Sequence, residues 1–176
     1  MSGKREYMVL SATGEDRVGL VEELTDRISS SHGNIEDSRM ALLGGEFSII
    51  MLLSGDKGAL DKLKSETESI EKELNLSLKI KDTRSPIQQK GQSYRLETVS
   101  PDSRGLVHLL TLVLKKHGVN IEEMKTEILP APWTGTPMFH LKGTIVVPPS
   151  VDFRELREDL LQLESEKDLD IFLKPL

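Results

Sequence analysis

The chain contains no cysteine and one tryptophan, and aromatic residues make up only 4% of its 176 residues. Without cysteine, disulfides, thiolate nucleophiles and cysteine-type zinc sites are all excluded. No apolar stretch reaches the roughly 20 residues that a membrane-spanning helix needs. The apolar run Met8-Val9-Leu10 is also far too short for the core of a secretory signal peptide. The sequence therefore predicts a cytoplasmic protein with no membrane partner.

The chain also lacks an excess of positive charge. It has 23 Lys and Arg residues against 29 Asp and Glu residues, which gives a formal net charge of −6 at pH 7. Neutralising nucleic-acid phosphates needs a concentrated basic face, and the sequence shows no basic run. We therefore expect no direct nucleic-acid partner.

Recognisable catalytic and metal-binding patterns are missing as well. The four histidines stand outside any nucleophile–base or metal-ligand motif, and no Walker-type or dinucleotide glycine pattern occurs. His32 and His117 are expected at helix C-termini, where the helix dipole favours a positive charge. Paired acidic residues such as Glu22-Glu23 are typical of a solvated face. The sequence thus predicts no catalytic residue, no metal site and no cofactor, and an enzyme is not expected.

What the chain does contain is the same unit twice. The segment Asp16–Thr25 is similar to Asp102–Thr111. At the same spacing, Asn34-Ile35-Glu36 aligns with Asn120-Ile121-Glu122. Self-similarity of this kind indicates that one structural unit has been repeated. Two copies of roughly 80–90 residues would fill the chain.

In the first copy, short apolar runs predict strands over residues 7–12, 35–43, 47–53 and 76–80. Apolar residues at helical spacing predict a helix that Asp16 caps and that ends near Gly33, a glycine suited to a left-handed position. A second helix is expected between Asp56 and Leu74. Gly44-Gly45 is a hairpin signal between the two central strands.

In the second copy, the same patterns predict strands over residues 92–99, 121–129, 138–147 and 169–173. Helices are expected from Leu106 towards Gly118, and after Ser150 as N-cap. A stiff loop, Pro130–Pro137, replaces the Gly44-Gly45 hairpin and holds the only tryptophan.

The order strand–helix–strand–strand–helix–strand is that of the ferredoxin-like arrangement. We therefore predict an α+β protein with two tandem βαββαβ domains, each a four-stranded antiparallel sheet with two helices on one face. The expected bounds are residues 1–84 and 92–176, joined by a polar linker at 85–91 that contains Pro and Gly. Small units with open sheet edges often pair, so a homodimer is expected.

The turn before the first helix of each copy suits both charged ends of an amino acid. Its glycine lets a ligand approach backbone N–H groups that favour a carboxylate by about 0.3–1 kcal/mol. Its aspartate could hold an ammonium group, and its arginine could form a forked pair with a carboxylate. The residues are Asp16, Arg17 and Gly19 in one copy and Asp102, Arg104 and Gly105 in the other. The alternative is structural, with Asp as helix N-cap and Gly as the residue of a tight turn.

Asn34 and Asn120 precede the second strand of each copy. Asn tolerates the left-handed conformation well, so one reading is a turn residue after a helix. The other reading is an amide that binds a ligand or the neighbouring unit. The identical placement in both copies does not separate fold from function.

These residues resemble a known family, the ACT domains. The resemblance lies in the turn Gly14–Leu20, in the links Gly33-Asn34-Ile35 and Gly118–Ile121, and in the strand–helix order. The loop Pro130–Phe139 is similar to the second domain of tandem ACT proteins of the glycine cleavage system repressor type. The resemblance covers nearly the whole chain.

The resemblance implies a non-catalytic, amino-acid-sensing regulatory protein. Its effector is expected to be a small amino acid, glycine or serine foremost, and its protein partner to be of the transcriptional activator kind. Residue chemistry and resemblance together predict the ligand-binding set Asp16, Arg17, Gly19, Leu20, Asn34, Ile35, Asp102, Arg104, Gly105, Leu106, Asn120 and Ile121. Serine-binding members of the family often have Asn in place of Asp16 and Asp102. Arg17 aligns with Ser103, and Arg104 with Val18, so the two turns are chemically unequal.

Other functions fit the same pattern. The chain could be a structural protein that forms dimers through its sheet edges without a small ligand, or it could regulate an enzyme in trans. RNA-recognition domains share the strand order, but they stack bases on aromatic strand residues. The strongest predicted strand, Phe47-Ser48-Ile49-Ile50-Met51, lacks the aromatic pair that this would need.

Overall fold

The computed structural model describes residues 5–85 and 90–176. The chain divides into two compact units, residues 1–87 and 88–176. Most of the predicted linker, residues 86–89, lies outside the described residues.

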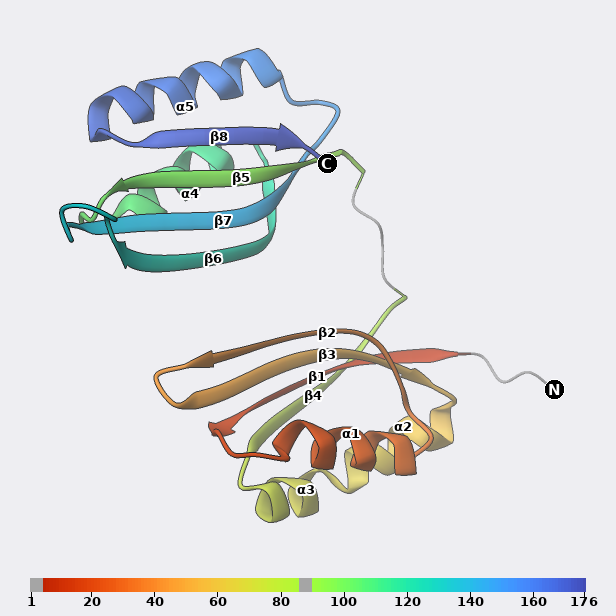
Figure 1. Ribbon diagram of the computed structural model, residues 1–176. Coiled ribbons are helices and arrows are strands. Elements are labelled where there is room, and N and C mark those ends of the chain that lie inside the picture. The colour runs from red at the N-terminus through yellow and green to blue at the C-terminus, as the bar shows by residue number, and fades with distance from the viewer. Residues whose placement is uncertain (1–4, 86–89) are drawn as a thin grey trace. The chain divides into compact units, whose positions relative to one another are not determined.

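The first unit is one antiparallel sheet with its helices on one face (Figure 1). Its strand order is β2-β3-β1-β4. The elements are β1 (Glu6–Glu15), α1 (Leu20–Ser30), β2 (Asn34–Leu43), β3 (Glu46–Gly55), α2 (Lys57–Ser65), α3 (Thr67–Leu74) and β4 (Ser77–Thr83). Gly44 and Gly45 both have positive φ, 62° and 86°, as a tight hairpin turn requires.

The second unit repeats this topology with the strand order β6-β7-β5-β8. Its elements are β5 (Gln92–Pro101), α4 (Leu106–Lys116), β6 (Asn120–Pro130), β7 (Pro137–Val147), α5 (Phe153–Lys167) and β8 (Asp170–Pro175). The predicted pair of ferredoxin-like βαββαβ units is therefore confirmed. Among the described residues, no helix is long and apolar enough to cross a membrane.

Each unit has its own hydrophobic core between sheet and helices. Alternate residues of β1 and β3 point to the helices, and every third or fourth residue of α1 points back to the sheet. In the first unit the fully buried residues include Met8, Leu10, Leu24, Ile28 and Leu53. The corresponding layer of the second unit includes Leu96, Leu110, Leu114, Ile145 and Leu156. The repeat in the sequence is thus a repeat of two separate cores.

The expected single helix between Asp56 and Leu74 is in fact two helices, α2 and α3. Asp56 is the N-cap of α2, as predicted, and its side chain accepts a hydrogen bond from the Ala59 N–H at 2.8 Å. The break follows at Glu66, beside Thr67, whose hydroxyl donates to the carbonyl oxygens of Leu63 and Lys64 at 3.3 and 2.9 Å. A hydroxyl that bonds back to the preceding turn in this way bends helices.

Two further details differ from the sequence-based expectation. Ser150 does not cap the last helix: Asp152 does, accepting hydrogen bonds from the Arg154 and Glu155 N–H groups. The left-handed residue after α1 is His32, with φ 62°, and not Gly33. Gly33 is needed for space, because a Cβ there would lie 3.2 Å from the Ile28 carbonyl oxygen.

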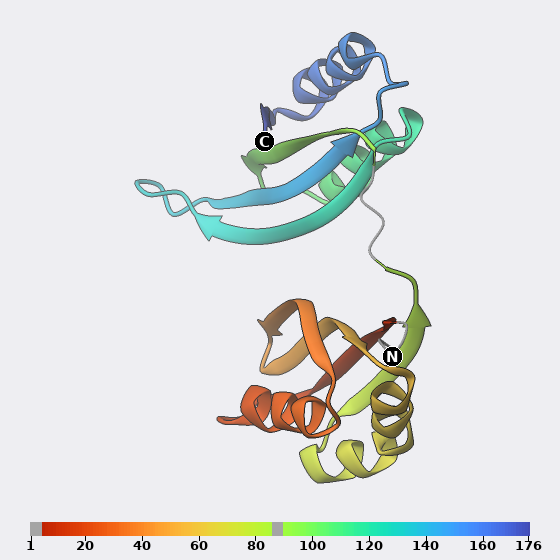
Figure 2. The same cartoon turned by 90° about the vertical axis from the view of Figure 1, so that its right-hand side faces the viewer.

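The loop that interrupts the second repeat is a short hairpin connection between β6 and β7. It is closed by hydrogen bonds from the Ala131 N–H to the Thr136 carbonyl (2.8 Å) and from the Gly135 N–H to the Ala131 carbonyl (3.0 Å). Trp133 at its tip is 97% exposed. Figure 2 shows this connection projecting beyond the strands of its own sheet.

The edge strands β2 and β6 are exposed along almost their whole length. Leu42 and Ile128 hold equivalent positions on these strands, opposite the buried Phe47 and Phe139, and are 54% and 52% exposed. An exposed apolar edge with free N–H and C=O groups favours pairing with another strand. We propose these two strands as the pairing surfaces of the predicted dimer.

We therefore predict that a charge on the pairing edge dissociates a dimer. Leu42→Lys or Ile128→Lys should raise the dimer dissociation constant by about tenfold or more, because a lysine on an edge strand opposes pairing. Sedimentation velocity across a concentration series measures this. Leu112→Lys, on the helical face of the second unit, serves as the control. A monomeric parent chain, or two edge variants that sediment like the parent, would contradict the prediction.

Candidate functional site

A left-handed glycine begins the first helix of each unit. Gly19 has φ 92° and directly precedes α1, and Gly105 has φ 84° and directly precedes α4. This conformation is open to glycine at little cost and is strained for other residues. No side chain caps either helix, so the first backbone N–H groups carry the positive end of the helix dipole without a protein carboxylate on them.

Asp16 and Asp102 do not cap these helices, which corrects the structural reading made from the sequence. Helix α1 begins at Leu20, four residues after Asp16. The aspartates instead tie the end of the first strand to the neighbouring hairpin through their backbone. The Asp16 N–H donates to the Gly45 carbonyl, and the Asp102 N–H donates to the Pro137 carbonyl, both at 3.1 Å. Their carboxylates remain exposed.

In the first unit, the arginine of the turn forms an ion pair with a glutamate of α1. Both terminal nitrogens of Arg17 bond to the Glu23 carboxylate, Nη1 to Oε1 at 2.6 Å and Nη2 to Oε2 at 2.5 Å. This forked hydrogen bond lowers the pKa of Glu23 and raises that of Arg17. A Cβ on Gly19 would lie 3.4 Å from Glu23 Oε1. Arg17 is thus already paired with a carboxylate, and Glu23 places a negative charge in the first turn of α1.

In the second unit, the equivalent turn is open. Arg104 forms no ion pair or side-chain hydrogen bond with any residue that the structure describes. A Cβ on Gly105 would meet nothing within 4 Å, and the first turn of α4 contains no acidic residue. Leu109 stands where the first unit has Glu23. The two copies therefore differ in whether a carboxylate from outside could reach the turn.

Leu20 and Leu106 could contact the predicted ligand only through their backbones. Their side chains are 1% and 4% exposed and belong to the two cores. Ile35 and Ile121 are half-buried and pack against the same cores. These four side chains shape the fold around the turns and the second strands.

Asn34 and Asn120 lie at the opposite end of their units from the turns. Asn34 pairs with Ser54, which pairs with Tyr7 at the start of β1, whereas Asp16 follows the end of that strand. Nine residues of extended chain separate the two levels by about 30 Å. The same register places Asn120 beside Val146, far from Asp102. The predicted set thus divides into two separate surfaces in each unit, which the sequence repeat did not indicate.

Asn34 belongs to a polar cluster around Glu36. The Glu36 carboxylate accepts hydrogen bonds from the hydroxyl of Ser54 (2.5 Å) and the amide nitrogen of Asn34 (2.9 Å), and it pairs with Arg5 at 2.5 Å. These contacts, the Ser54 hydroxyl foremost, lower the pKa of Glu36. Glu36 lies where the register between β2 and β3 shifts, and Glu122 lies at the same shift in the second unit. Asn34 therefore has a structural partner.

A groove of about 470 Å³ runs between α1 and the start of β2, with Asn34 and Ile35 in its wall. Glu22 and Asp26 of α1 also line it, and no arginine or lysine does. A carboxylate ligand would find no positive partner there. The groove therefore does not extend the carboxylate-binding character of the turns.

Comparison with known proteins places these features in a family. The family model of the ACT domain matches residues 6–81. The glycine cleavage system transcriptional repressor of Escherichia coli (strain K12) is 33% identical over 163 residues, which cover 92% of this chain and 86% of that protein.

Two crystal structures match almost the full length of the chain. A protein of unknown function from Galdieria sulphuraria is 32% identical, with a TM-score of 0.81 and coverage of 98% of this chain and 99% of that one. A structure described as that of a glycine cleavage system transcriptional repressor is 21% identical, with a TM-score of 0.74 and coverage of 99% of both chains. The tandem arrangement of the two units is thus found in other proteins.

The Glu36 cluster predicts how the stability of the fold should depend on pH. The pKa of Glu36 is lower in the folded chain than the unfolded value of about 4.3, so its stabilising effect is complete above that pH and is lost as the pH falls through the folded pKa. Urea unfolding between about pH 6 and pH 3 should therefore show a smaller loss of stability in Glu36→Gln than in the parent chain. Glu122→Gln is the matched control, because the Glu122 carboxylate forms no ion pair or hydrogen bond with the residues that the structure describes, and it should lose stability as the parent does. Equal losses in all three chains would contradict the prediction.

Proposed function

The chain belongs to the ACT-domain family of glycine cleavage system transcriptional repressors, and we propose that it senses a small amino acid and passes the signal to a protein partner. As a member of this family, the chain is a regulatory protein and not an enzyme. The amino acid, the partner and the site are the proposal. We expect sensing to take place in the cytoplasm.

The proposal rests on the open turn of the second unit, residues 102–105. It offers uncapped backbone N–H groups at the start of α4, a glycine that leaves room for a ligand, and the unpaired guanidinium of Arg104. A helix N-terminus and an arginine both favour a carboxylate. Asp102 adds an exposed carboxylate on the same turn, which suits the ammonium end of the same molecule. The turn therefore has a complement for each charge of a zwitterion.

Glycine and serine are the proposed ligands because the turn has no apolar hollow for a large side chain. The nearby side chains of Leu106 and Leu110 are buried in the core, Val107 and Leu109 are half-buried, and the exposed side chains between Pro101 and Gly105 are the polar or charged Asp102, Ser103 and Arg104. An amino acid with little or no side chain can use both charged contacts without exposing an apolar group to water. The names of the relatives, which refer to glycine cleavage, support the same choice.

A protein partner, such as a transcriptional activator, fits the charge of the chain better than nucleic acid does. The formal net charge is −6, which opposes binding to a phosphate backbone. The exposed edges β2 and β6, with apolar residues such as Met40 and Leu129, are surfaces on which another chain could add a strand. A change in the ligand state of the second unit would act on such a contact by shifting a population of conformations.

We predict that Arg104→Gln weakens glycine or serine binding by about 10- to 100-fold, because a hydrogen bond to a charged group is worth about 1.5–3 kcal/mol. Arg17→Gln is the matched control, since Arg17 is already paired with Glu23. It should change the affinity by less than about twofold. Isothermal titration calorimetry on the full chain, with thermal unfolding as a second readout, measures both variants.

Two results would contradict the proposal. If no amino acid binds the parent chain at millimolar concentration, ligand sensing fails and the structural, dimer-forming alternative is favoured. If Arg17→Gln abolishes binding and Arg104→Gln does not, the site lies on the first unit and the assignment to the second is wrong.

A further inference from the structure

The second unit exposes one large apolar side chain almost completely. Trp133, the only tryptophan of the chain, lies at the tip of the loop of residues 130–137 and is 97% exposed. We refer to this segment as the Trp133 loop. It lies within residues 128–139, which contain no charged side chain although 30% of the whole chain is charged. Tryptophan is among the residues that most often dominate the binding energy of protein interfaces, so its exposure here indicates a contact surface.

The Trp133 loop holds this side chain on a stiff backbone. Three of its eight residues are proline, and backbone hydrogen bonds close it. The hydroxyl oxygens of Thr134 and Thr136 form a further hydrogen bond at 2.9 Å. An anchor that is already ordered loses little conformational entropy when it binds. The first unit has no counterpart, because Gly44 and Gly45 form the hairpin there.

The sheet of the first unit has an apolar hollow of about 180 Å³ on the face opposite to its helices (Figure 1). Val9, Ile50 and Leu52 point to this face, because the residues next to them in β1 and β3 are buried against the helices. Ile50 is 49% exposed. Arg39 of β2 also lines the hollow and pairs with Asp37. The hollow is therefore an apolar surface with a guanidinium group at its rim.

The second unit shows what the same sheet face looks like when it suits water. The strand registers place Arg95, Lys142 and Thr144 at the positions of Val9, Ile50 and Leu52. An antiparallel sheet with one face in water is expected to carry polar residues on that face, and the second unit follows this rule. The first unit departs from it at three neighbouring positions. Apolar groups that the repeated copy replaces with polar ones indicate a surface that another molecule covers.

Basic side chains border the hollow. Lys81 is the partner of Val9 in the sheet, and Lys79 is the next residue of β4 on the same face. Neither side chain has an ion pair or hydrogen bond with a residue that the structure describes. Glu15 and Glu46 are on this face as well, but they lie opposite each other at the hairpin end and do not line the hollow. The unpaired charges beside the hollow are therefore positive.

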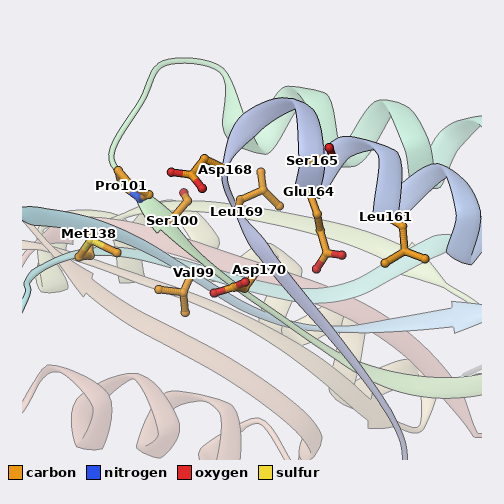
Figure 3. A pocket seen from close by; sticks show the side chains of 10 residues that line it. All are labelled: Val99, Ser100, Pro101, Met138, Leu161, Glu164, Ser165, Asp168, Leu169 and Asp170. Carbon is orange, nitrogen blue, oxygen red and sulfur yellow. The ribbon is translucent and has the colours of Figure 1, made fainter.

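Acidic side chains lie near the base of the Trp133 loop. The Asp102 N–H donates to the carbonyl of the last residue of the loop. Asp168 and Asp170 line the same cavity as Met138, which directly follows the loop (Figure 3). These three carboxylates have no ion pair or hydrogen bond within the part of the chain that the structure describes. Arg104 is the basic residue of the adjacent turn, so these groups leave an excess of negative charge beside the loop.

We propose that the Trp133 loop of one chain docks into the hollow of a second copy of the chain. The indole would bury its face on the apolar wall, with the Arg39 guanidinium as a cation–π partner, and the carboxylates beside the loop would approach Lys79 and Lys81. Each unit supplies the feature that the other lacks, which favours a second copy over an unrelated protein. The contact is small beside a stable interface of about 1,200–2,000 Å², so the association is expected to be weak. It is separate from the edge pairing of β2 and β6 and does not depend on the proposed function.

The single tryptophan makes this contact directly measurable by fluorescence. Trp133→Ala has no tryptophan and keeps the hollow. Ile50→Lys keeps Trp133 and loses the hollow, and its fold should be preserved because the second unit has Lys142 at the equivalent position. When Trp133→Ala is titrated into Ile50→Lys, the emission should move to shorter wavelength and saturate, because the indole leaves water. The double variant Trp133→Ala/Ile50→Lys, used as the titrant, should leave the emission unchanged.

The parent chain should show the same emission shift when its own concentration rises from micromolar to millimolar. Ile50→Lys should weaken this self-association by about tenfold or more, because it removes the wall on which a dominant side chain packs. Ser48→Lys is the matched control: it adds the same charge on the same strand and face but does not line the hollow, and it should associate as the parent does. Lys79→Glu should weaken the association by about two- to fivefold, and added salt should weaken it in the parent.

Three outcomes would overturn the assignment. These are a parent emission that does not change with concentration, an equal shift when the double variant is the titrant, and equal association of the parent and Ile50→Lys. An emission shift that appears only with phosphatidylcholine vesicles would assign the Trp133 loop to a lipid surface and contradict the docking. Amino-acid sensing is judged by a different variant, Arg104→Gln, so failure of the docking leaves the proposed function in place.

Discussion

Each half of the chain depends on one glycine that connects the first strand to the first helix with a positive φ. Gly19 and Gly105 let the chain reverse within a few residues, so that α1 and α4 can pack on the sheet next to their own strands. The same geometry leaves both helices without side-chain caps, and in α1 the Leu20 N–H donates to the Arg17 carbonyl at 3.3 Å. Backbone hydrogen bonds from Asp16 and Asp102 to the neighbouring hairpins hold the turns in place. The left-handed glycine that the fold requires thereby creates a helix N-terminus that suits an anion.

The two copies have kept this fold and changed its chemistry. Glu23 pairs with Arg17 in the first unit, whereas Leu109 in the second leaves Arg104 unpaired. Before the turn, Gly14 packs closely against Asn75 and Leu76 in the first unit, whereas its counterpart Ser100 lines a cavity of about 510 Å³ in the second. We therefore interpret the first unit as the copy that contributes structure and the second as the copy that contributes ligand recognition.

The order of strands and helices could be predicted because hydrophobic periodicity reports which face of an element is buried. The turn residues were found by their repetition, but their roles were not. Asp16 before a helix looks like an N-cap, and only the backbone shows that Gly19 begins the helix instead. The closure of the first turn depends on Glu23 folding back onto Arg17. The sequence does not show that contact directly. The signal that it contains is the difference between Glu23 and Leu109, which hold equivalent positions in the two copies. The cavity that Ser100 lines depends on how the ends of β5 and α5 and the start of β8 meet, which periodicity does not describe.

The proposed ligand sensing depends most on a carboxylate binding the start of α4 and not the start of α1. The direct measurement is a ¹H–¹⁵N NMR titration of the labelled full chain with glycine and then serine. Saturable shifts at the amides of Gly105, Leu106 and Val107, with little change at Gly19, Leu20 and Val21, are the predicted result. Shifts confined to the first turn, or none at either turn while the ligand binds elsewhere, would contradict it.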